Sequence, residues 1–152
     1  DSNSILQEGD ILLSIRHLHS ILQLREGKII RKIIGGFSKQ HDVDIFDANS
    51  ITIFNNNSTS GYYPWVDTLK SEIIHKNLIT GRDSIIFQSQ FLSTHTEGQT
   101  QTIGDYRLIE NQNSHHILIL KQNKLIYRDQ LKNSTDTTKV NLLNWTQIYF
   151  KS

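Results

Sequence analysis

Histidine and arginine side chains occur at two places in this sequence where they could do chemistry. Arg16, His17 and His19 follow one apolar run, and Gln40-His41-Asp42 follows the glycine pair Gly35-Gly36. If a regular strand continues through them, His17 and His19 point to one face, as a pair of metal ligands would. Two ligands do not make a metal site, and an isolated His-Asp pair is a motif of low specificity. These residue types therefore indicate candidate groups and leave their chemistry open.

Several common functional classes lack support in the sequence. It has no Gly-rich phosphate loop, no recognisable pair of catalytic carboxylates and no Gly-x-Ser-x-Gly elbow. Without cysteine, disulfides, thiolate metal sites and cysteine nucleophiles are excluded. A net charge of +1, from 16 basic and 15 acidic residues, gives no footprint for nucleic acid or an anionic membrane. No apolar run is long enough to span a bilayer.

The elements that must position these residues are short apolar runs rich in isoleucine. They have strand length, are bounded by Gly, Asn, Asp and Ser, and favour β structure because isoleucine packs well on a pleated surface. The predicted strands are 11–15, 21–24, 29–34, 51–54, 85–87, 117–120, 125–127 and 148–150. Strands at this spacing are typical of a sandwich, a barrel or a propeller.

An internal repeat decides among these architectures. The segment 9–33 returns at 104–129 with one residue inserted, and the repeat aligns Gly27 with Asn123. Both residue types readily adopt the positive φ that a tight hairpin requires. A third copy of the leading strand begins near Asn49, so the starts lie 40 and 55 residues apart. These intervals bracket the length of a four-stranded propeller blade.

We therefore predict an all-β chain that forms one partial β-propeller domain over residues 1–152. It would contain about three four-stranded antiparallel blades, starting near residues 9, 49 and 104. Propellers normally close with about four to eight blades, so three would leave an open arc. We expect that arc to be completed either by a missing N-terminal half or by a second copy of the chain.

The residues singled out above also carry a family resemblance. Four elements resemble the arylsulfotransferase-like propeller family: the Gly-Asp strand that ends in Ser-x-Arg at 9–16, the Gly-Lys hairpin at 27–28, the Gln-His pair at 40–41 and the Phe-Asn-Asn element at 54–56. The resemblance covers nearly the whole chain in one register.

The resemblance implies half of a six-bladed, exported (periplasmic or secreted) enzyme that moves a sulfuryl group between phenols through a sulfo-histidine. His41 falls on the family's nucleophile and Arg16 on the arginine that holds sulfate oxygens. His17, His19 and Asp42 would bind the small aromatic sulfate or phenol, and no metal or cofactor is needed. The sequence departs from the family pattern at these last three positions, and the family's further histidines lie in earlier blades.

Two alternatives stay open at this stage. The chain could be a non-catalytic propeller module that binds a partner or ligand, because a fold does not fix a function. His17, His19 and His41 could instead line a metal site. Whether the chain is an enzyme depends on what completes the ring.

Overall fold

The computed structural model describes residues 4–58, 70–92, 98–111 and 116–130. Within these residues the chain is all β, with eleven strands in three antiparallel sheets and two single-turn 3-10 segments, Arg16–Leu18 (η1) and Gln90–Leu92 (η3). This confirms the all-β part of the predicted fold class. None of the helical segments in the described ranges has the length and apolar character needed to cross a membrane.

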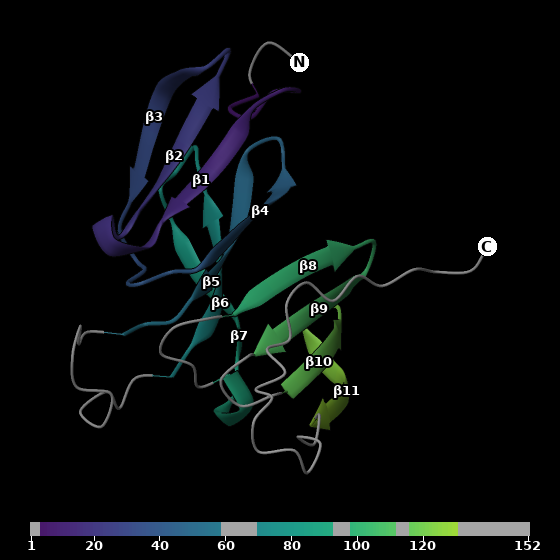
Figure 1. Cartoon of the computed structure of the whole chain (residues 1–152). Coiled ribbons are helices and arrows are strands. Elements are labelled where there is room, and N and C mark those ends of the chain that lie inside the picture. Colours follow the sequence, from purple (N-terminus) through teal and green to yellow (C-terminus); the bar gives the residue numbers. More distant parts are fainter. Residues whose placement is uncertain (1–3, 59–69, 93–97, 112–115, 131–152) are drawn as a thin grey trace, which may run out of the picture.

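The three sheets follow one another along the chain, as Figure 1 shows. The first sheet consists of β1 (Ile11–Ile15), β2 (Ser20–Arg25) and β3 (Lys28–Ile34). The second consists of β4 (Asp42–Asp47), β5 (Ser50–Asn55), β6 (Glu72–Asn77) and β7 (Asp83–Gln88). The third consists of β8 (Gln99–Ile103), β9 (Tyr106–Asn111), β10 (His116–Lys121) and β11 (Lys124–Gln130). In each sheet the strands lie side by side in chain order.

The strands related by the sequence repeat are β1, β5 and β9. They are the first strand of the first sheet and the second strand of each of the other two sheets. The repeated starts near residues 9, 49 and 104 come directly before β1, β5 and β9. Both β5 and β9 pair with a preceding strand, β4 or β8, whereas β1 lies at the edge of its sheet. The second and third sheets thus have the expected four strands, and the first sheet has three among the described residues.

Tight hairpins join the two last strands of the first and third sheets. Glu26 and Gly27 have φ values of 50° and 73°, and Gln122 and Asn123 have 49° and 63°. Positive φ at both central residues is the mark of a type I′ turn, which matches the twist of antiparallel strands. The alignment of Gly27 with Asn123 is therefore confirmed as a match of backbone conformation. The predicted strand at 148–150 lies outside the described residues.

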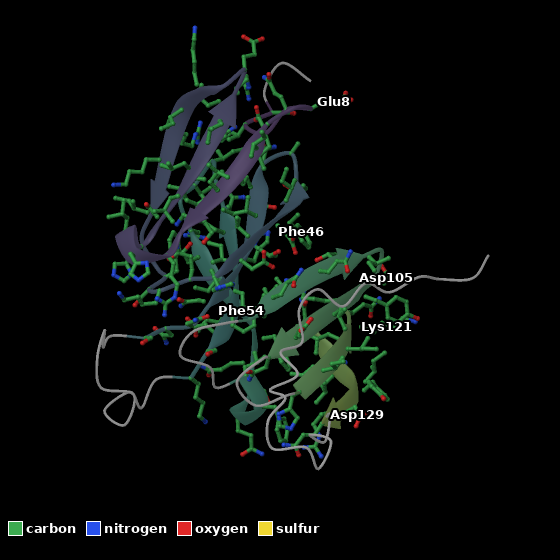
Figure 2. The ribbon with its side chains drawn as sticks, viewed as in Figure 1. Glu8, Phe46, Phe54, Asp105, Lys121 and Asp129 are labelled. Atoms are coloured by element: carbon green, nitrogen blue, oxygen red, sulfur yellow. The ribbon has the colours of Figure 1, made fainter. Side chains whose placement is uncertain are left out.

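Two hydrophobic cores lie between consecutive sheets, and β5 contributes to both. All six residues of β5 are buried. Successive side chains of a strand point to opposite faces, so Ile53 packs into the core shared with the first sheet and Phe54 into the core shared with the third. Figure 2 shows Phe54 where the second sheet meets the third. The first core is built from Leu6, Ile21, Ile33, Phe37, Ile51, Ile53 and Ile74, and the second from Phe54, Ile73, Leu92, Ile109, Leu118 and Leu120.

Candidate functional site

The sequence-predicted site residues come together where β1 ends and β4 begins. Arg16 opens the η1 turn directly after β1, and His41 immediately precedes β4. These two strands contact each other across the first and second sheets. Ser14 Oγ of β1 lies 3.5 Å from the carbonyl oxygen of Gln40, so the end of β1 meets the residue before His41.

The segment that carries His41 is held against the first sheet by hydrogen bonds from both of its preceding residues. Gln40 is fully buried, and its Nε2 donates to the carbonyl oxygen of Ser20 at 2.9 Å. The backbone N–H of Lys39 donates to Nδ1 of His19 at 2.9 Å. In this bond Nδ1 of His19 is the acceptor. His19 therefore holds the segment in place.

His17 and His19 do not share the face of a continued strand. β1 ends at Ile15, and the next three residues form η1. His19 has a φ of 46°, in the left-handed region, so the chain turns there before β2. The condition for a two-ligand strand arrangement is not met, because a tight turn replaces the alternation of side chains. Among the described residues no group of three or more His, Asp or Glu side chains is placed to hold a metal ion.

The side chains of His41 and Arg16 differ in their surroundings. His41 is exposed, and only its backbone is tied to the second sheet, by an N–H that donates to the carbonyl oxygen of Phe54 at 3.0 Å. Arg16 is half-buried, and its Nη1 lies 3.5 Å from Nε2 of the exposed His17. The accessible imidazole of His41 and the partly buried guanidinium of Arg16 lie on neighbouring segments, and groups of these types can take part in a reaction that develops negative charge on oxygen.

Asp42 points away from this surface and joins the second sheet to the third. Its Oδ2 accepts a hydrogen bond from the backbone N–H of Thr100 at 2.8 Å. Burial raises the pKa of Asp42, and the hydrogen bonds from Thr100 and Val43 oppose that effect. The structure therefore gives Asp42 a contact that fixes the start of β4, directly after His41.

A second pair of titratable groups, Asp44 and Arg107, lies between the same two sheets and was missed by sequence reasoning. Burial, and then the neighbouring charge of Asp42, raise the pKa of Asp44 to about 7, while the guanidinium of Arg107 on β9 opposes the rise. Burial lowers the pKa of Arg107 in turn. The alternation of acids at 42 and 44 within an apolar strand was a signal, but their partner lies in another sheet.

Asp44 makes the stability of the fold depend on pH. Its folded-state pKa of about 7 lies above the ordinary value of 3.8. The contribution of the protonated Asp44 carboxyl to folding stability is therefore fully present below about pH 4 and is lost as the pH rises through 7. Asp44→Asn stays neutral throughout. We expect the unfolding free energy of the variant, relative to that of the wild type, to increase by roughly 2 kcal/mol when the pH is raised from about 5 to about 8. Urea unfolding at both pH values measures this.

The matched control is Asp129→Asn, which removes an exposed acid from β11. The unfolding free energy of this variant should differ from that of the wild type by the same amount at both pH values. A pH-independent difference for Asp44→Asn would contradict the raised pKa of Asp44. Because only changes with pH are compared, the packing effect of the amide cancels.

Comparison with known proteins agrees with the residue pattern. A family model described as arylsulfotransferase (ASST) matches residues 2–137. No curated protein matches the chain. The matched range includes every candidate residue at the junction of β1 and β4.

Proposed function

The chain belongs to the arylsulfotransferase (ASST) family, and from this premise we propose that it transfers sulfuryl groups between phenolic compounds through a sulfo-histidine at His41. The observation that supports the proposal is the exposed His41 imidazole on a segment fixed beside the Arg16 turn. The family gives the reaction class. Periplasmic or secreted localisation follows as part of the same proposal.

The proposed reaction has two displacement steps at sulfur. A ring nitrogen of neutral His41 attacks the sulfur of an aryl sulfate, the N–S bond forms, and the bond from sulfur to the aryl oxygen breaks. The phenolate leaves and takes a proton from solvent. The oxygen of an acceptor phenol then attacks the same sulfur and loses its proton, and the N–S bond breaks. Covalent catalysis of this kind divides one difficult transfer into two easier ones.

Arg16 would stabilise the sulfuryl oxygens in both steps. Its guanidinium is planar and always charged, and it can donate two parallel hydrogen bonds to an oxyanion. We propose that the exposed His17 beside it contacts the substrate, and that His19 and Asp42 contribute by fixing the two ends of the 39–42 segment.

Arg16→Lys tests this role without removing the charge. Since lysine cannot form the bidentate fork, we expect kcat for 4-nitrophenyl sulfate to fall by about ten- to a hundredfold, with a smaller change in KM. Initial rates of nitrophenol release measure both constants. Arg31→Lys, an exposed position on β3, is the control and should keep wild-type rates. Equal rates for Arg16→Lys and wild type would remove Arg16 from the mechanism.

The primary experiment is covalent labelling of the chain. Incubation with 4-nitrophenyl sulfate should add one sulfuryl group to the intact mass, and peptide mapping at alkaline pH should place it on His41. A confirmed family enzyme serves as the positive control. If that enzyme labels and this chain neither labels nor releases nitrophenol, the proposed reaction is wrong for this chain.

We further propose that the three sheets are blades that form half of a six-bladed ring. Among the described residues β1 is the edge strand of the first sheet, whereas the equivalent strands β5 and β9 each pair with a preceding strand. The first sheet therefore has room for one more strand beside β1. Either further chain or a second copy would supply it. Light scattering distinguishes the two, because a particle of twice the chain mass supports the homodimer and a monomer argues for completion by further chain.

A non-catalytic binding module is the second candidate. It is favoured by apolar side chains of the first sheet that remain exposed, including Ile11 at 56% and Ile34 at 62% exposure. Such side chains on a sheet face are typical of an association surface. A chain that stays monomeric and takes no sulfuryl label would support this candidate over the enzyme.

A further inference from the structure

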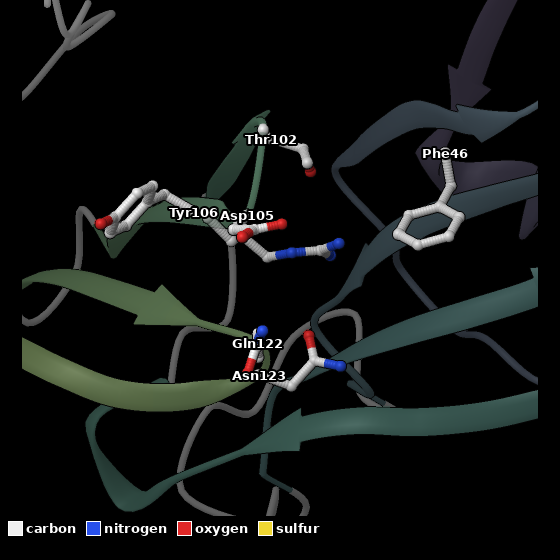
Figure 3. A pocket seen from close by; sticks show the side chains of 8 residues that line it. Phe46, Thr102, Asp105, Tyr106, Gln122 and Asn123 are labelled. Atoms are coloured by element: carbon white, nitrogen blue, oxygen red, sulfur yellow. The ribbon is translucent and has the colours of Figure 1, made fainter.

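A pocket of about 160 Å³ lies between the second and third sheets, away from His41. Phe46 of β4 forms one side of the pocket (Figure 3). Residues of β8 and β9, including Arg107, and the turns that join β8 to β9 and β10 to β11 form the rest. Phe46 follows His41 by five residues along β4, which places it roughly 16 Å away at the other end of the strand. The pocket is therefore separate from the proposed sulfuryl-transfer site.

Arg107 gives this pocket a buried positive charge. Its side chain is 4% exposed, and its Nη1 atom has no hydrogen-bond partner. Asp44 Oδ2 is also buried without a partner, so the two groups attract each other without forming a hydrogen bond. A buried guanidinium is costly unless an anion or acceptor satisfies it. Arg107 also lines the pocket, so its uncompensated charge attracts an anionic ligand there.

Phe46 gives the same pocket an apolar face. Phe46 is 51% exposed on β4, an edge strand of the second sheet, and His75 covers one side of its ring at a centroid distance of 5.0 Å. Figure 3 shows Phe46 on one side of the pocket, Thr102 and Asp105 on the opposite side, and Gln122 and Asn123 below. A flat aromatic ligand could stack on this ring or meet it edge to face.

The size and charge of the pocket narrow the ligand class. Cavities of about 150 Å³ accept a benzene-sized molecule. The planar fork of Arg107 fits a carboxylate, and the amides of Gln122 and Asn123 can donate to it. Asp105 at the rim disfavours a ligand with two negative charges. A single carboxylate on one aromatic ring meets all of these conditions.

We propose that the pocket between the second and third sheets binds a small aromatic carboxylate, with its carboxylate on Arg107 and its ring on Phe46. The proposal does not depend on sulfuryl transfer at His41. Its ligand binds as an intact molecule, and no bond forms or breaks.

Benzoate is the probe, and binding is followed by the amide NMR shifts of the full chain during titration. We expect saturable shifts at residues that line the pocket, such as Thr102 and Asn123. Acetate, which lacks the ring, and benzyl alcohol, which lacks the charge, should each bind about tenfold more weakly. Equal binding of acetate or inorganic sulfate would mean a simple anion site and would overturn the proposal, as would the absence of saturable shifts.

Three variants separate the contributions. Phe46→Ala should weaken benzoate binding about tenfold, and Arg107→Met should weaken it at least as much. Asp105→Asn should strengthen binding about threefold, because it removes a repulsive charge from the rim. Asp129→Asn, an exposed acid elsewhere in the third sheet, should leave the affinity unchanged.

Asp105 is exposed and Phe46 is half exposed, so their variants keep the test decisive if Arg107→Met does not fold. Unchanged affinity in Phe46→Ala, or weaker binding in Asp105→Asn, would contradict the proposed placement of the ligand. Labelling of His41 by aryl sulfate should be the same with and without saturating benzoate, which distinguishes this site from the catalytic one.

Discussion

His41→Asn is expected to abolish sulfuryl labelling and to lower the turnover of aryl sulfate at least about a thousandfold, because the variant has no nucleophile for the first displacement. The substitution should leave the fold intact. The His41 side chain is exposed, and its only described hydrogen bond to the second sheet uses the backbone N–H, which asparagine keeps. Intact mass and initial rates of nitrophenol release measure the two effects.

His116→Asn is the matched control for that experiment. His116 belongs to β10 of the third sheet, where its ring packs beside Phe91. We expect this variant to label at His41 to the same extent as the wild type. If His41→Asn still acquires one sulfuryl group, another residue is the nucleophile, and peptide mapping of the variant will identify it.

Phe54→Ala is expected to cost about 3–5 kcal/mol of unfolding free energy, the largest stability effect we predict. The Phe54 side chain is fully buried and belongs to the core that joins the second sheet to the third. Its ring lies against Gly98, where a side-chain carbon would collide with it. Truncation would leave a cavity in the core between these two sheets, and urea unfolding measures the loss.

Phe46→Ala is the comparison for Phe54→Ala. Phe46 lies on the adjacent strand of the same sheet but is 51% exposed, so its truncation should cost less than about 1 kcal/mol. A loss below about 1 kcal/mol for Phe54→Ala as well would mean that the core collapses around the missing ring and that the two sheets are not coupled through it.

The candidate site was predictable in part. Arg16 and His41 were identified from residue types and a family resemblance, and they lie on segments that meet at the ends of β1 and β4. The roles of His19 and Asp42 were not predictable, because each depends on one hydrogen bond to a distant backbone N–H, that of Lys39 or Thr100. Such bonds depend on which segments the fold brings together.

Local sequence patterns account for much of the secondary structure. Isoleucine-rich runs predicted most of the described strands, and Gly27 and Asn123 predicted the hairpin turns, because strand pleating and positive φ depend on single residues and their neighbours. The strands β4, β6 and β8 were not among the predicted runs, because polar residues interrupt their apolar pattern. The proximity of Asp44 to Arg107 and the position of Phe46 at a pocket depend instead on the three-dimensional arrangement of the sheets. Their environments come from the packing of separate sheets, which no local pattern encodes.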